Sequence, residues 1–135
     1  MPTINPVDAS VIAATGASIG TGTAGQTIVQ GDVLYADSTD GGDLKLADSS
    51  ALLTAAVVGI ALNAAADKQP MDYIKSGTLS VGSVTTLGAT YFLSTTAGQI
   101  IDTLPASGEF SVVLGIGLTS STFKVGIVVS GVAVP

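Results

Sequence analysis

The side chains that most enzymes use for chemistry are almost absent from this sequence. Its 135 residues contain no histidine and no cysteine, and its four positive charges are all lysines. Without histidine or cysteine, the common nucleophilic triads and the usual zinc and haem sites cannot be assembled. Without arginine, bidentate clamps on phosphate or carboxylate groups are also excluded. The sequence therefore predicts a protein that is not an enzyme, with no catalytic residues, no cofactor and no metal.

Two catalytic arrangements stay open in principle, and neither is favoured. A serine or threonine nucleophile can use a lysine as its base, but the lysines occupy predicted strand or turn positions that solvent should surround: Lys45, Lys68, Lys75 and Lys124. Glycoside hydrolysis needs a pair of carboxylates, whereas Glu109 is the only glutamate and most aspartates fall in predicted turns. With three tyrosines and no tryptophan, the chain also offers little aromatic surface to a sugar ring.

Four aspartates lie close together in one predicted hairpin: Asp37, Asp40, Asp43 and Asp48. Oxygen-rich loops of this kind can bind Ca²⁺. The bidentate acidic ligand and the ligand spacing of the familiar calcium loops are missing, however. We therefore favour an exposed Asp-Gly turn over a cation site.

The charge of the chain limits its partners. Charged residues make up 10% of the sequence, against about 25% in ordinary globular proteins, and the net charge is −6. Binding to nucleic acid or to anionic membranes needs lysine or arginine in number, so we expect neither partner. So few charges leave much neutral surface, which suggests burial against other subunits. The N-terminus has no basic start and no apolar core of a signal peptide, and no apolar run approaches the length of a membrane span; we expect synthesis in a cytoplasm.

From residue 26 onward, short β-rich runs alternate with turn residues. Turn signals recur about every ten residues, the spacing of a β-sandwich or a small β-barrel. The one helix candidate is residues 49–56, a single turn at most, capped by Asp48 or Ser49. The sequence predicts an all-β fold with one β domain over residues 26–135.

Three blocks of sequence recur in the same order about 55 residues apart, which is typical of an internal duplication. Residues 31–44 match residues 88–100, each a glycine, an apolar strand and a polar turn closed by glycine. Val57-Val58-Gly59-Ile60 matches Val113-Leu114-Gly115-Ile116, and Ile74-Lys75-Ser76-Gly77 matches Val128-Val129-Ser130-Gly131. We therefore expect two similar β-units, at approximately 28–81 and 85–134, packed on one core.

Residues 1–25 differ from the rest, because glycine, serine, threonine and alanine dominate them. Such a segment has little to bury and much conformational entropy to lose. It is either a frayed terminus or an extended N-terminal arm that orders against a neighbouring subunit. The candidate partner contacts of that arm are its apolar residues: Ile4, Val7, Val11, Ile12 and Ile19.

The order of the strand motifs resembles the small capsid cement, or head decoration, proteins of tailed bacteriophages. The resemblance runs over roughly residues 26–134 and is carried by Gly31-Asp32-Val33-Leu34-Tyr35, then Val58-Gly59-Ile60-Ala61-Leu62, Ser76-Gly77-Thr78-Leu79, Gly88-Ala89-Thr90-Tyr91-Phe92 and Val113-Leu114-Gly115-Ile116-Gly117. It implies an all-β structural protein, usually a homotrimer, on the outer capsid surface of the virion. There it would bind the major capsid protein and bridge neighbouring subunits.

Two other functions remain open at this stage. A phage tail or fibre β domain that binds host-surface glycans is the main alternative, although such domains usually show clustered aromatic residues. A secreted adhesin or surface-layer module is the other, and it would normally need an export signal.

Overall fold

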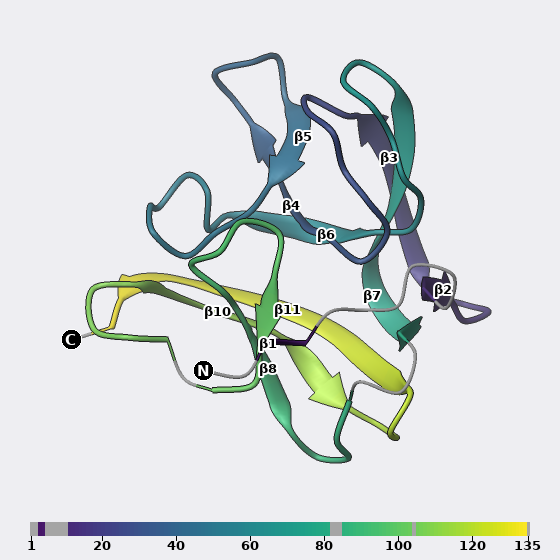
Figure 1. Cartoon of the computed structure of the whole chain (residues 1–135), viewed down its shortest axis with the longest axis vertical. Coiled ribbons are helices and arrows are strands. Elements are labelled where there is room, and N and C mark those ends of the chain that lie inside the picture. The colour runs from purple at the N-terminus through teal and green to yellow at the C-terminus, as the bar shows by residue number, and fades with distance from the viewer. Residues whose placement is uncertain (1–2, 5–10, 82–84, 104, 135) are drawn as a thin grey trace.

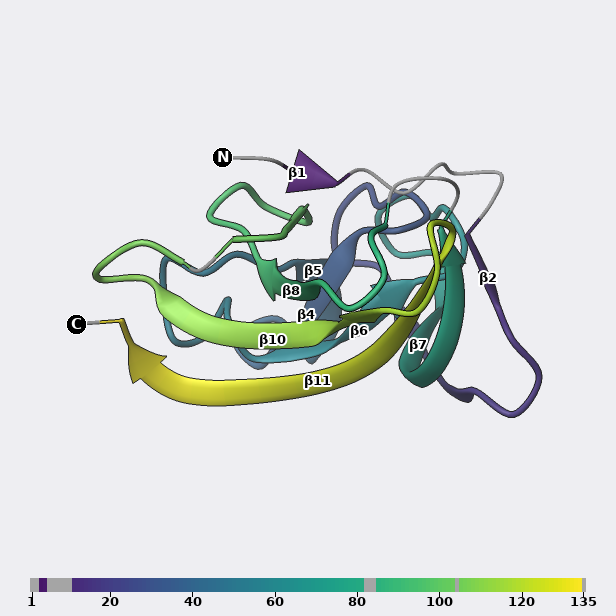
Figure 2. The ribbon, with the colours of Figure 1, turned by 90° about the horizontal axis from the view of Figure 1, so that it is seen from below.

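The computed structural model describes residues 3–4, 11–81, 85–103 and 105–134. All the regular secondary structure in these residues is β-strand, so the predicted all-β fold class is confirmed. The strands pair into one antiparallel sheet that curls into a half-barrel (Figures 1 and 2).

The strands are rich in valine, isoleucine, leucine and tyrosine, which fit a pleated and partly buried surface. In chain order they are β1 (Thr3–Ile4), β2 (Val11–Ala13), β3 (Ser18–Thr23), β4 (Val33–Asp37), β5 (Asp43–Leu46), β6 (Val57–Ala61), β7 (Pro70–Val81), β8 (Thr90–Leu93), β9 (Ile100–Ile101), β10 (Phe110–Gly117) and β11 (Thr122–Ala133). Gly41 and Gly42 close the β4–β5 hairpin with positive φ angles of 67° and 84°, which residues with a β-carbon rarely adopt.

Two units of four strands share one pairing scheme. In the first unit, β4 pairs with β5 and β6, and β6 pairs with β7; in the second unit, β8 pairs with β9 and β10, and β10 pairs with β11. The units join where β7 pairs antiparallel with β11, so the sheet order is β9-β8-β10-β11-β7-β6-β4-β5. The sheet is therefore built from two similar β-units that meet where β7 pairs with β11.

The correspondence between the units holds for single residues. Leu34 lies opposite Gly59 in the first unit, and Tyr91 lies opposite Gly115 in the second. A register shift follows the glycine pair in both places, as expected for a β-bulge inherited by both units. In the third block, strand pairing makes Ile74 equivalent to Lys124 rather than to Val128, because Ile60 pairs with Ile74 and Ile116 pairs with Lys124.

The two units pack front to back, which means that the faces in contact are not equivalent faces of the two units. The main hydrophobic cluster combines one face of the first unit with one face of the second, and it includes Val33, Ile60, Ile74, Tyr91, Leu114 and Phe123. Tyr91 and Phe123 meet there edge to face, with ring centroids 5.5 Å apart. A smaller cluster covers the opposite face of the first unit with Ala24, Ile28, Leu34, Leu44, Ala61, Ala65 and Met71. The first unit is thus buried on both faces.

The described N-terminal strands lie on this chain's own sheet. β2 and β3 pair with the edge of β7 that faces away from β6 and β11, and β1 pairs with β9. At residues 49–56 the chain makes turns rather than a helix. One helix-like hydrogen bond runs there from the Ala55 N–H to the Ala51 carbonyl, and the Asp48 carboxylate accepts from the Ser50 N–H.

We predict that Gly115→Ala destabilises the fold by about 2 kcal/mol or more, since overpacking of this kind usually costs 1–3 kcal/mol. A β-carbon on Gly115 would lie 2.0 Å from the Lys124 carbonyl oxygen and 3.0 Å from the Phe123 ring. The control is Gly126→Ala on the neighbouring strand, where a β-carbon would meet nothing within 4 Å. Urea denaturation measures both free energies of unfolding. Equal stabilities for the two variants would contradict the close packing of β10 on β11.

Candidate interaction surface

The second unit leaves one face of its sheet uncovered, and we call this the outer face. Paired residues on adjacent antiparallel strands point to the same side, which places Thr90, Ile116 and Lys124 in one row and Phe92, Val113 and Val128 in another. A further row of paired residues adds Thr122, Ser80 and Ile12. The outer face therefore extends over β8, β10, β11, β7 and β2.

Three large apolar side chains project from the outer face into solvent. Ile116 is 46% exposed, Val128 is 62% exposed and Ile12 is 61% exposed. Lys124 is the one charged residue among the nine that define this face. A single exposed valine or isoleucine is ordinary, but several on a face with one charged residue make it a candidate interaction surface.

In the first unit the equivalent face is part of the protein core. Val33, Ile60 and Ile74 correspond to Thr90, Ile116 and Lys124, and all three are fully buried. They are buried because the second unit packs on them in the main cluster. Nothing in the described part of the chain packs on the outer face of the second unit in the same way.

The end of β11 continues this uncovered surface. β7 pairs with β11 only as far as Gly126, so residues 127–133 have β10 on one edge and no described strand on the other (Figure 2). Val129 and Val132 are 40% and 66% exposed. The Ser130 hydroxyl accepts a hydrogen bond from the Val132 N–H, and Gly131 has a φ of 69°, so the strand kinks at this point. An apolar edge of this type invites a further strand.

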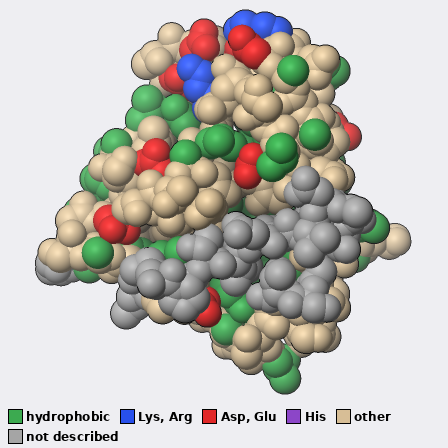
Figure 3. All heavy atoms as spheres, viewed as in Figure 1, with side chains coloured by type: hydrophobic (Ala, Val, Ile, Leu, Met, Phe, Trp, Pro, Cys, Tyr) green, Lys and Arg blue, Asp and Glu red, His purple; other side chains and the backbone are tan. Residues whose placement is uncertain are grey.

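The ion pairs of the described residues lie instead at the β4–β5 end of the molecule. Lys45 forms ion pairs with Asp37 (2.9 Å) and Asp40 (3.1 Å), and Lys68 pairs with Asp43 (2.7 Å). In Figure 3 the lysines in view lie with several carboxylates at the top of the molecule. Hydrogen bonds from Thr39 and Lys45 lower the pKa of Asp37 to about 2, and Asp37 and Asp40 raise the pKa of Lys45 above its ordinary value. In the predicted Asp-Gly turn, three aspartates are therefore ion-paired with two lysines.

The residues weighed for catalysis are not brought together. Lys45 and Lys68 are held in the ion pairs above, Lys75 and Lys124 are exposed on separate strands, and Glu109 accepts a hydrogen bond from the Ser49 hydroxyl at 3.0 Å. Among the described residues, no three carboxylates lie close enough to hold a metal ion.

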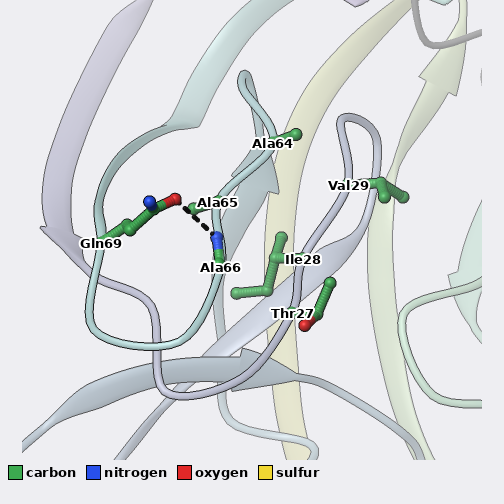
Figure 4. A pocket seen from close by; sticks show the side chains of 7 residues that line it. All are labelled: Thr27, Ile28, Val29, Ala64, Ala65, Ala66 and Gln69. Carbon is green, nitrogen blue, oxygen red and sulfur yellow. Dashed lines mark hydrogen bonds between the residues drawn. The ribbon is translucent and has the colours of Figure 1, made fainter.

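An open pocket of about 280 Å³ lies beside the smaller cluster (Figure 4). Its lining comes from two loops and is mostly apolar: Thr27, Ile28, Val29, Ala64, Ala65, Ala66 and Gln69. Ile28 and Ala65 exchange two backbone hydrogen bonds of 2.8 and 2.9 Å, and the Gln69 side chain accepts from the Ala66 N–H at 2.9 Å. The pocket is small, backbone hydrogen bonds join its two loops, and its lining contains no aromatic residue.

The candidate arm contacts fall in several places. Ile12 lies on the outer face, Ile19 is 42% exposed on β3, and Val11 pairs with Val81. Ile4 pairs with Ile100 on β9, while Val7 lies outside the described residues. Sequence reasoning did not single out Ile116 or Val128 as contacts. The internal repeat could have pointed to Ile116, because it aligns this exposed residue with Ile60, which is buried in a contact between the units.

A scan of protein-family models finds none that matches this chain, and no curated protein is similar to it in sequence. No helix in the described ranges is long and apolar enough to cross a membrane.

We predict that Asp37→Asn lowers the melting temperature at neutral pH, because an amide cannot replace the carboxylate that accepts from Thr39 and Lys45. The folded pKa lies near 2, below the ordinary 3.8, so the carboxylate stabilises the fold fully above pH 4 and loses this effect as the pH falls through 2. The gap between wild type and variant should therefore close between about pH 4 and pH 2. Thermal melts against pH measure it, with the half-exposed Asp40→Asn as control. A gap that stays constant down to pH 2 would contradict the assignment.

Proposed function

We propose that this protein is a decoration, or cement, protein that binds the outer surface of a tailed-phage head and bridges major capsid subunits. The observation that carries the proposal is the outer face, where Ile116, Val128 and Ile12 are exposed and Lys124 is the one charged residue. Such a face presents shape and apolar contact to neighbours, while the ion pairs of the β4–β5 end lie elsewhere.

The distribution of side chains supports a role without chemistry. A catalytic mechanism with lysine as its base would need a lysine beside a nucleophile. Lys45 and Lys68 form ion pairs instead, and Lys75 and Lys124 are exposed to solvent. A structural protein needs only a rigid fold and complementary faces. A protein that binds the assembled shell and not its separated subunits stabilises the shell by mass action, and many identical copies multiply this effect.

The glycan-binding alternative has less support. Stacking on a sugar ring needs exposed aromatic side chains, and the described pocket is lined by alanine, isoleucine and valine. Phe92 is the aromatic residue of the outer face, and it is only partly exposed between its neighbours. The lining of the pocket therefore favours the head over a tail fibre as the proposed location.

The direct test uses phage particles from which the gene for this chain has been deleted. We expect antibody labelling to place the protein on the outside of wild-type heads, and heads without it to release their DNA at a lower temperature. Adding purified protein back should restore the wild-type release temperature. Labelling confined to tails, or heads whose stability does not depend on the protein, would overturn the proposal.

A further inference from the structure

We propose that an extended, acidic segment of the major capsid protein adds as a further strand to the free edge of β11 at residues 127–129, beside Lys75 and Lys124. The inference deepens the proposed function and rests on it, because it names the part of the shell protein that this chain binds. Two independent observations carry it. One is a sheet edge that no described strand pairs with, and the other is a pair of lysines that no described carboxylate neutralises.

The free edge begins where β7 turns away from β11 (Figure 2). The last pair of residues between these strands is Ser76 with Gly126, whereas β10 still lies opposite β11 at Val128 and Val129. Within an edge strand, alternate residues direct their N–H and C=O groups away from the sheet. An extended chain satisfies such groups by pairing with them as a new strand. The edge therefore specifies the conformation of its partner.

Side chains on both sides of β11 are open along this edge. Val128 lies opposite Val113 on the outer face and is 62% exposed. Val129 lies opposite the buried Val112 on the core side of the sheet, yet it is 40% exposed. An added strand with apolar residues would cover both valines, and burial of their apolar area favours the contact.

Lys75 and Lys124 flank the point where β7 leaves β11, one on each strand. Ile74 and Val125, their neighbours in sequence, both belong to the main hydrophobic cluster. Successive residues of a strand point to opposite sides of the sheet, so both lysines project from the side opposite the main core. By strand spacing and rise, their α-carbons are roughly 10 Å apart. A strand added at the free edge would begin or end between these two ammonium groups.

The charges along the edge indicate what the added strand should carry. Lys45 and Lys68 are ion-paired, whereas Lys75 and Lys124 are exposed and pair with no carboxylate of the described chain. Residues 127–133 carry no charge. At the far end, the Val134 N–H donates a hydrogen bond to the carbonyl of Glu109, so a carboxylate lies there. The edge thus changes from positive to neutral to negative, which fits a partner with acidic residues at one end only.

The lysines also give the added strand a register. Backbone pairing alone permits a partner strand to slip by two residues, because the hydrogen-bonding pattern repeats at that interval. Opposite charges across an interface fix the register and speed the encounter. Acidic residues of the shell segment would therefore settle against Lys75 and Lys124, with the apolar residues of the segment along Val128 and Val129.

The first test measures the affinity of the purified protein for phage heads that lack it. Lys75→Glu and Lys124→Glu should each weaken binding by about tenfold or more, because each places a negative charge against the acidic segment. The matched control is Lys68→Glu, which makes the same change of charge at a 64% exposed side chain near the β4–β5 end and should bind like the wild type. Equal affinities for all three variants would overturn the inference.

The second test identifies the occupant of the edge. Because the chain has no cysteine, Val128→Cys and Val29→Cys each supply one thiol for a benzophenone maleimide. On illuminated heads, Val128→Cys should crosslink to one acidic segment of the major capsid protein. Val29→Cys, at a 44% exposed valine beside the pocket, should not reach that segment. Crosslinks from Val128→Cys only to further copies of this chain, or to a capsid segment without acidic residues, would contradict the inference.

The outcomes separate the two proposals. If heads bind the protein but neither lysine matters and no acidic capsid segment is crosslinked, the inference fails and the proposed function stands. If the wild-type protein does not bind heads, both fail.

Discussion

The structure depends on the burial of apolar faces in a sheet made of two repeated units. Each unit has two such faces, and burying apolar area is the main source of stability available to a chain with few charges and few aromatic residues. The first unit has both faces covered, one by the second unit and one by the small cluster around Ile28 and Leu34. The second unit has one face covered. When repeats stack front to back, one face of the last repeat stays uncovered. Here that uncovered face carries Ile116 and Val128.

The close approach of strands in both units comes from two equivalent glycines. A β-carbon on Gly59 would meet the Tyr73 ring and the Ile74 carbonyl, and one on Gly115 would meet the Phe123 ring and the Lys124 carbonyl. The aromatic ring over Gly115 belongs to the main core, whereas the ring over Gly59 faces the smaller cluster. The same contact between a glycine and an aromatic ring thus occurs in both units. The ring is fully buried where it belongs to the main cluster and partly buried where it packs on the smaller one.

Much of this fold could be predicted from the sequence. The spacing of turn residues gave the all-β class, and the Val-x-Gly-Ile motif marked equivalent strands correctly because its glycine is fixed by packing. The third block misled the alignment, since Ser-Gly pairs occur at both Gly77 and Gly131 for local reasons of strand bending. The interaction surface was harder to predict. Ile60 and Ile116 have the same sequence context, and only the tertiary packing decides that one is buried and the other exposed.

The central claim is that the outer face and the free edge of β11 are covered in the working assembly. Amide hydrogen exchange at those residues of 127–129 whose N–H groups point away from β10 tests it most directly, because unpaired edge amides exchange quickly and paired or buried ones slowly. The account predicts fast exchange in dilute protein and marked slowing once the protein associates or binds heads, while the β4–β5 turn stays unchanged. Exchange at residues 127–129 that stays fast in the assembled protein would contradict it.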